Sequence, residues 1–164
     1  SNMFRIGIGE DTHRLAAGRK LILGGVEIPF ELGLLGHSDA DALAHAVIDA
    51  LLGACALGDI GQHFPDSDEA FRGISSLLLA KEAAARIRAA GFETVNIDSV
   101  ITAQKPKLAP FREAMRANLA EALGVPPENI SVKFTTPEGT GPEGNLECIT
   151  VRAVAAVRKV RIQC

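Results

Sequence analysis

The sequence is poor in aromatic residues, with seven Phe, no Trp and no Tyr among its 164 residues. Proteins that bind single-stranded nucleic acid stack bases on such rings, so this composition disfavours that class. Positive charge is also scarce, because 17 Lys and Arg are outnumbered by 20 Asp and Glu and the net charge is −3. We therefore expect no nucleic-acid partner, since a phosphate backbone is bound mainly through surplus positive charge.

The sequence lacks the marks of membrane and secreted proteins as well. No apolar run approaches the roughly 20 residues of a membrane helix, and no basic segment followed by an apolar stretch opens the chain. We expect no membrane partner. Cys55, Cys148 and Cys164 are odd in number and show no C-x-x-C spacing, which argues against a disulfide framework or a cysteine zinc site. Free thiols favour a reducing compartment, so we expect a bacterial cytoplasm, or a plastid if a transit peptide was removed.

The length and composition suit one domain with a buried aliphatic core. Hydrophobic residues make up 47% of the chain, and no repeat, charge block or Pro/Ser-rich linker divides it. We therefore expect a single domain over residues 1–164. Ser1 and Asn2 precede Met3, and we interpret them as an expression scar.

The spacing of apolar residues predicts an α+β fold. Strands are predicted at 4–9, 94–102, 130–135 and 148–157, with a small hairpin at 20–30. Helices are predicted at 39–56, 75–90 and 110–123, and a loop at 58–68. Ser38 or Asp39 would cap the first helix. This order indicates a mixed four-stranded sheet plus the hairpin, with three helices on one face.

The last predicted strand is apolar on both sides. One side carries Val151, Ala153, Ala155 and Val157, and the other carries Val154 and Ala156. Because one helical layer cannot cover both faces of a sheet, this pattern indicates an oligomer.

Two histidines and a carboxylate have the spacing of a metal site. Asp11 and His13 are two residues apart and point to the same side of an extended chain. His45 shares one helix face with Asp41 and Asp49. Two histidines and one carboxylate with an open fourth position form the pattern of catalytic zinc, and Asp49 would orient the imidazole of His45. On spacing alone, a set of solvated polar groups is the alternative interpretation.

Longer motifs give a more specific signal. They are RIGIGEDTHRL at 5–15, GLLGHSDAD at 33–41, DALLG at 49–53, LGDIGQHFPDSD at 57–68, AQKPK at 103–107 and KFTTPE at 133–138. In this order and spacing, the chain resembles the 2-C-methyl-D-erythritol 2,4-cyclodiphosphate synthase family nearly end to end.

The resemblance implies an assembly and an activity. The assembly is a homotrimer of α+β subunits, with the second sheet face packed at the trimer axis and active sites between neighbours. The activity is cyclisation of 4-diphosphocytidyl-2-C-methyl-D-erythritol 2-phosphate to the 2,4-cyclodiphosphate with release of CMP, in the non-mevalonate isoprenoid pathway. The protein would then be a metal-dependent phosphorus–oxygen lyase, and its small-molecule partner a cytidine diphosphate substrate.

The resemblance also implies roles for individual residues. Asp11, His13 and His45 would bind Zn²⁺, and Glu138 would bind a second cation, Mg²⁺ or Mn²⁺. His37 and Thr136 would be catalytic. The substrate would be bound by Ser38, Asp59, Ile60, Gly61, Phe64, Pro65, Asp66, Ser67, Asp68, Ala103, Gln104, Lys105, Pro106, Lys107, Leu108, Ala109, Thr135, Thr136, Pro137 and Glu138.

The sequence departs from the family pattern in two places. Pro142 and Asn145 stand where the family has an apolar residue and an Arg near the threefold axis, which leaves open whether a ligand binds in the central channel. Ile8 and Glu10 replace a His and an aromatic residue. Two other functions stay open: a zinc-dependent phosphoester hydrolase, suggested by the open metal position, and a catalytically impaired binding homologue, suggested by the altered loop.

Overall fold

The computed structural model describes residues 3–161. Ser1 and Asn2, the expected expression scar, and the expected free thiol of Cys164 lie outside these residues. The strands are β1 (Phe4–Ala16), β2 (Leu21–Leu23), β3 (Val26–Ile28), β4 (Gly33–Leu34), β5 (Phe92–Thr102), β6 (Ile130–Thr135) and β7 (Cys148–Lys159). The helices are α1 (Ala42–Ala54), α2 (Ile60–His63), α3 (Ser76–Ala89), α4 (Arg112–Leu123) and α5 (Gly141–Gly144).

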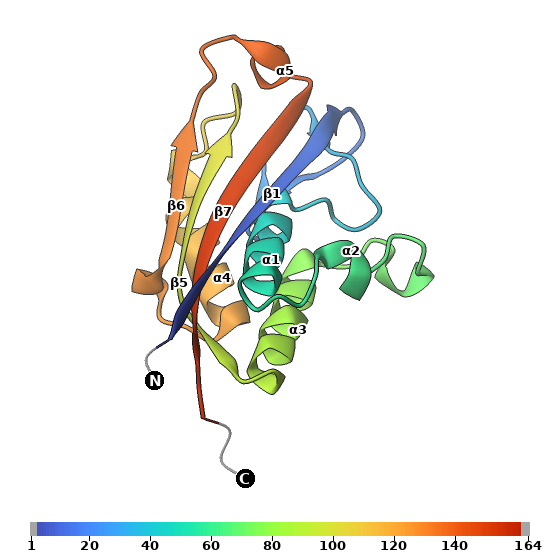
Figure 1. Ribbon diagram of the computed structural model, residues 1–164. Coiled ribbons are helices and arrows are strands. Elements are labelled where there is room, and N and C mark those ends of the chain that lie inside the picture. The colour runs from blue at the N-terminus through green and yellow to red at the C-terminus, as the bar shows by residue number, and fades with distance from the viewer. Residues whose placement is uncertain (1–2, 162–164) are drawn as a thin grey trace.

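The main sheet has the strand order β4-β1-β7-β5-β6, and β2 and β3 form the separate predicted hairpin. The sheet is mixed, because β5 and β6 run parallel while the other neighbours are antiparallel. Figure 1 shows β1 and β7 side by side with α1 behind them, and α3 and α4 on that same face. The predicted α+β architecture is confirmed.

The structure corrects several predicted boundaries. A fifth strand, β4, joins the sheet, and its two residues are too short to give a periodic signal. β1 continues past Gly9 to Ala16, where polar side chains on both faces hide the strand pattern. The cap of α1 is Asp41 rather than Ser38 or Asp39, because Ala40 has a φ of 57° and interrupts the helical backbone before it. The predicted loop at 58–68 contains α2, which Asp59 and Gln62 cap reciprocally.

Close packing of α1 against β1 depends on two glycines. Gly7 and Gly9 lie on the sheet face that carries Ala153 and Ala155 of β7. A Cβ on Gly9 would lie 1.9 Å from the carbonyl oxygen of Ala46, and one on Gly7 would lie 2.1 Å from that of Ala50. Only glycine fits at this distance. The contact brings α1 directly onto the strand that carries Asp11 and His13.

The opposite face of the sheet is apolar and open in the single chain. Ile6 and Ile8 of β1 are 77% and 71% exposed, and Val154 of β7 is 45% exposed. Val151 and Ala153, on the helix side, are buried. The predicted two-sided apolar pattern is therefore confirmed, and packing of the open face at a trimer axis stays a prediction. Among residues 3–161, no helix combines the length and the apolarity that a membrane crossing requires.

Candidate metal centre and substrate cavities

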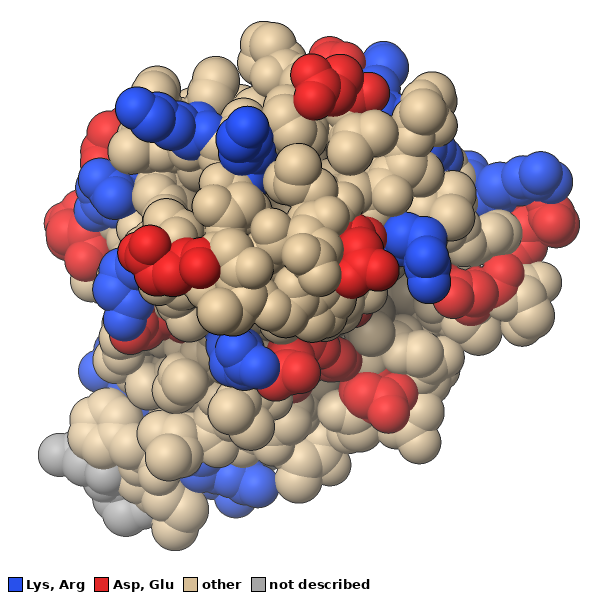
Figure 2. Space-filling view, turned by 90° about the horizontal axis from the view of Figure 1, so that it is seen from above, with Lys and Arg blue, Asp and Glu red and all other residues tan. Residues whose placement is uncertain are grey.

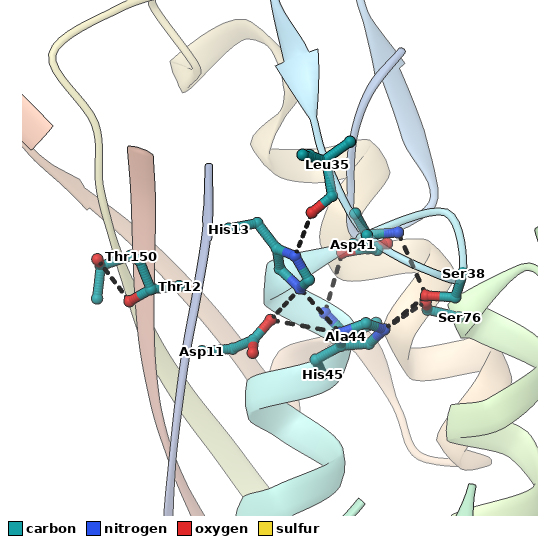
Figure 3. A network of polar contacts seen from close by, with 12 residues as sticks. Asp11, Thr12, His13, Leu35, Ser38, Asp41, Ala44, His45, Ser76 and Thr150 are labelled. Carbon is teal, nitrogen blue, oxygen red and sulfur yellow. Dashed lines mark hydrogen bonds and ion pairs between the residues drawn. The ribbon is translucent and has the colours of Figure 1, made fainter. Parts of the chain in front are cut away.

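Asp11, His13 and His45 meet at the junction of β1 and α1. The Nε2 atom of His13 lies 2.8 Å from Oδ2 of Asp11, and Nδ1 of His45 lies 3.3 Å from the same oxygen. The two ring nitrogens are 3.2 Å apart. Figure 3 shows the three side chains turned toward one another, while Thr12 between them in sequence points to the other face of the strand. The spacing of the sequence therefore brings three candidate metal-ligand atoms together.

The outer hydrogen bonds of the two imidazoles set their tautomers. His13 donates from Nδ1 to the carbonyl oxygen of Leu35 at 2.9 Å. His45 donates from Nε2 to the hydroxyl oxygen of Ser76 at 2.8 Å. Each neutral imidazole has one N–H, so its other nitrogen carries a lone pair. In this arrangement Nε2 of His13 and Nδ1 of His45 both present lone pairs to Asp11.

The centre requires a positive charge. The Oδ2 atom of Asp11 is buried and has no hydrogen-bond partner, and the three candidate ligand atoms lie within 4.8 Å of one another. Burial alone would raise the pKa of Asp11, but the imidazoles of His13 and His45 outweigh it and lower the pKa to about 2. Burial would lower the pKa of His13, yet Asp11 raises it above the ordinary value. A proton on an imidazole or a divalent cation meets this demand, and two nitrogens with one carboxylate oxygen suit Zn²⁺.

Asp49 does not make the expected contact with His45. Its carboxylate accepts a hydrogen bond from the amide of Ile60 at 2.7 Å and so holds the start of α2. Burial, which outweighs this hydrogen bond, raises the pKa of Asp49. The imidazole of His45 is held instead by Ser76, whose hydroxyl donates to Asp39. Sequence reasoning missed this pair because Ser76 is 31 residues from His45 and no local spacing connects them.

A cavity of about 290 Å³ opens onto the three candidate metal ligands. The predicted catalytic residue His37 lines it, together with the predicted substrate-binding residues Ser38, Ile60, Gly61, Phe64, Pro65 and Asp66. His37 lies 3.2 Å from the carbonyl oxygen of Asp68, and Ser67 lines an adjoining hollow together with His37 and Asp66. Asp59 is exposed and caps α2 at the rim. The structure therefore brings most of these predicted residues to one cavity, whereas Asp59, Ser67 and Asp68 are not part of its lining.

Most of the remaining predicted residues line a second cavity of about 490 Å³, but Lys105, Pro137 and Glu138 do not. Its lining includes Ala103, Gln104, Pro106, Lys107, Leu108, Ala109, Thr135 and Thr136, and it shares no residue with the first cavity. Lys105 is exposed and joined to Pro106 by a cis bond. The amide of Glu138, next to Pro137, donates to Thr136 Oγ1, and that of Gly139 donates to Gln104 Oε1. Glu138 thus belongs to the second cavity's loop.

The surface charges around these cavities are mixed. Figure 2 shows acidic and basic side chains interspersed over the upper face of the molecule, with a hollow between them. On the open face of the sheet, Lys133 pairs with Asp98 and Arg152 pairs with Glu10, so neighbouring charges compensate each other there too. The chain as a whole carries a net charge of −3, so it offers a polyanion no overall surplus of positive charge, and bound cations could supply it.

Comparison with known proteins places the chain in a family. Residues 4–158 match the YgbB family. The 2-C-methyl-D-erythritol 2,4-cyclodiphosphate synthase of Carboxydothermus hydrogenoformans is 60% identical over 158 residues, covering 96% of this chain and 97% of that protein. The bifunctional enzyme IspD/IspF of Albidiferax ferrireducens is 58% identical over 95% of this chain, which spans only 37% of that longer protein.

A solved structure agrees. A structure described as the Plasmodium falciparum IspF CDP complex superposes with a TM-score of 0.85 at 30% identity, covering 98% of this chain and 99% of that one. The fold similarity extends over nearly all of both chains. The chain is thus a member of the YgbB family, which confirms the resemblance carried by its motifs.

Proposed function

We propose that this protein cyclises 4-diphosphocytidyl-2-C-methyl-D-erythritol 2-phosphate to 2-C-methyl-D-erythritol 2,4-cyclodiphosphate and releases CMP, as a step of the non-mevalonate isoprenoid pathway. The observation that carries the proposal is the convergence of three candidate ligand atoms, from Asp11, His13 and His45, at the wall of a cavity that also presents His37 and Ser38. The name of the C. hydrogenoformans relative supports the reaction.

The proposed reaction needs no nucleophile from the protein. An oxygen of the substrate's 2-phosphate forms a bond to the β-phosphorus, and the bond from the β-phosphorus to the oxygen bridging the two phosphates breaks. The leaving group is CMP, which keeps that bridging oxygen. Because the attacking oxygen is already anionic, the protein's task is to hold the two phosphates in line and to compensate their charge.

Bound metal ions would supply the positive charge that the chain lacks. Asp11, His13 and His45 would hold Zn²⁺, and Glu138 would hold Mg²⁺ or Mn²⁺. Bound at these residues, the cations would polarise phosphate oxygens and stabilise the charge that develops on the leaving group.

Two hydroxyl groups and one imidazole would orient the phosphates. Ser38 Oγ lies at the cavity wall, 3.3 Å from the amide of Ala40, and its hydroxyl proton is available for a phosphate oxygen. Thr136 accepts a hydrogen bond from the amide of Glu138 at 3.0 Å, so its own proton is likewise available. His37 faces the same cavity as Ser38. These donors would bind the anionic substrate directly.

We propose that two neighbouring subunits of a homotrimer complete each active site. The metal centre and the cavity of 103–109 lie in separate parts of one chain, so one neighbour would supply each half. The open apolar face around Ile6, Ile8 and Val154 supports an assembly around the sheet. The second cavity would hold cytidine, and CDP in the Plasmodium falciparum complex supports a cytidine nucleotide as ligand. We place this activity in one domain and in a reducing bacterial cytoplasm.

Phosphorus NMR of the products tests the reaction. With the cytidylyl substrate, Zn²⁺ and Mg²⁺ supplied, we expect the cyclic diphosphate and CMP in equal amounts. A linear, water-opened product would indicate a phosphoester hydrolase instead, and no turnover would indicate a catalytically impaired homologue. Asp11→Asn is expected to abolish turnover, whereas Glu27→Gln, whose exposed ion pair with Lys20 lies on the separate β2–β3 hairpin, serves as the control.

A further inference from the structure

Ser76 is a buried polar residue with an unusual set of contacts. It is the first residue of α3 and is fully buried. Its amide donates to Oδ2 of Asp39 at 3.0 Å, and its hydroxyl donates to Oδ1 of the same carboxylate. The amide of Asp41 also donates to Oδ1, at 3.1 Å. The Asp39 carboxylate therefore fixes both the position of Ser76 and the direction of its hydroxyl proton.

A hydroxyl that donates to a carboxylate is a better hydrogen-bond acceptor, because the charge polarises its O–H bond. The lone pairs of Ser76 Oγ point toward His45, whose Nε2 lies 2.8 Å away. Asp39, Ser76 and His45 thus form a chain in which each proton has one position. The chain fixes the N–H of His45 on Nε2 and leaves Nδ1 free to face Asp11.

A second hydroxyl competes for the same imidazole proton. Ser38 Oγ lies 3.2 Å from Nε2 of His45, on the cavity side. A single N–H makes its strongest hydrogen bond to the closer and more polarised acceptor, which is Ser76. Figure 3 shows both serine side chains at the same end of the His45 ring. Because Ser76 accepts the hydrogen bond from the imidazole N–H, Ser38 is not required as its acceptor.

We propose that Ser76, held by Asp39, is a positioning residue with two effects. It holds the imidazole of His45 in the tautomer that binds a metal, and it leaves the hydroxyl of Ser38 free for the anionic substrate. The first effect concerns metal binding and is independent of the reaction. The second rests on the function proposed above.

The first test measures the Zn²⁺ dissociation constant by competition with a chromogenic chelator, for the full-length chain. Ser75→Ala is the matched control, because Ser75 is exposed, adjoins Ser76 and makes no capping hydrogen bond with its side chain. Ser75→Ala and Ser38→Ala are expected to bind Zn²⁺ as the unaltered protein does. Ser76→Ala should weaken binding about tenfold, since Ser38 can take over the imidazole, and the double variant Ser38→Ala/Ser76→Ala about 100-fold.

The second test uses substrate and compares the same variants. At Zn²⁺ concentrations that saturate every variant, Ser38→Ala should raise KM or lower kcat in the unaltered background and have little further effect in the Ser76→Ala background. Zinc binding by Ser76→Ala equal to that by Ser75→Ala would overturn the proposal. If Ser76→Ala fails to fold, Asp39→Asn replaces it in the test, because this variant weakens the polarisation of the Ser76 hydroxyl and keeps Ser76 itself. Asp39→Asn is expected to weaken Zn²⁺ binding several-fold, and unchanged Zn²⁺ binding by this variant would also overturn the proposal.

The two readouts separate this proposal from the proposed function. Dependence of Zn²⁺ affinity on Ser76 in a protein that forms no cyclic product would leave the positioning role standing and refute the cyclase. If the protein forms the cyclic product but its Zn²⁺ affinity does not depend on Ser76, the cyclase function stands and the positioning role of Ser76 is refuted.

Discussion

The contact between Gly9 and α1 offers a way to disturb the metal centre without touching a ligand. A Cβ at Gly9 would lie 1.9 Å from the carbonyl oxygen of Ala46, which is the residue after the ligand His45. Ordinary contact begins near 3.4 Å, so α1 must retreat from β1 by about 1.5 Å to accept a methyl group. Gly9→Ala therefore moves His45 away from Asp11 and His13.

The expected magnitudes follow from packing and from ligand geometry. Overpacking a tight contact costs about 1–3 kcal/mol, and for a chain of this size each kcal/mol lowers Tm by about 2–4 °C. We therefore expect Gly9→Ala to lower the Tm of the metal-free protein by about 2–12 °C. Metal–ligand distances tolerate only about 0.2 Å, so a displacement of this size should weaken Zn²⁺ binding at least tenfold.

Calorimetry of the metal-free protein and chelator competition measure the two effects. Gly53→Ala is the control, because it also adds a methyl group along α1 but the nearest atom, the carbonyl oxygen of Ile8, is 3.9 Å away. Alanine suits a helix better than glycine by about 0.5–1 kcal/mol, so this variant should keep or raise Tm. Normal Zn²⁺ affinity in a folded Gly9→Ala protein would refute the claim that this contact sets the ligand geometry.

Three further predictions concern other contacts. Asp41→Asn replaces one of two oxygens that accept from the amides of Gly24, Gly25 and Ala44, and thermal unfolding should show a loss of about 1–3 kcal/mol. Arg86→Met removes the hydrogen-bond donor to His63 and the cation over the Phe64 ring, so it should raise KM and lower the free energy of unfolding by about 1–3 kcal/mol. The control Arg88→Met, at an exposed position of the same helix, should change neither quantity. The Zn²⁺ affinity, measured as a function of pH, should be constant at high pH. It should fall by up to tenfold per pH unit for each proton displaced as the pH drops through the raised pKa of His13, because the imidazole must be deprotonated to bind the ion. A Zn²⁺ affinity that stays constant from pH 8 to pH 5 would contradict this prediction.

Local patterns in the sequence predict most of the fold. The helices α1, α3 and α4 and the four long strands carry the apolar spacing of their type, so they are found from sequence. The sequence does not reveal β4, because its two residues are in a strand only by pairing with Leu15 and Ala16. The cap of α1 is also missed, since the two predicted candidates, Ser38 and Asp39, precede Ala40, whose backbone conformation places the cap at Asp41 instead.

The metal centre and its support differ in how far sequence predicts them. Asp11 and His13 are neighbours on one strand, and the motifs join them to His45, so their meeting is predictable. The partner of His45 is not, because Ser76 reaches it only through the packing of α3 beside α1. Asp49 has the helical spacing to contact His45, but its carboxylate instead accepts a hydrogen bond from the amide of Ile60. Long-range hydrogen bonds of this kind require the tertiary structure.

The shared active site is the central claim, and mixing two inactive variants tests it most directly. Asp11→Asn disables the metal half and Glu138→Gln the cytidine half. In a trimer that joins halves from neighbouring subunits, random mixing at equal amounts restores about a quarter of the active sites. We therefore expect the co-expressed mixture to release CMP and cyclic diphosphate at about 25% of the unaltered rate, while each variant alone is inactive. An inactive mixture, in trimers shown to contain both variants, would contradict the account.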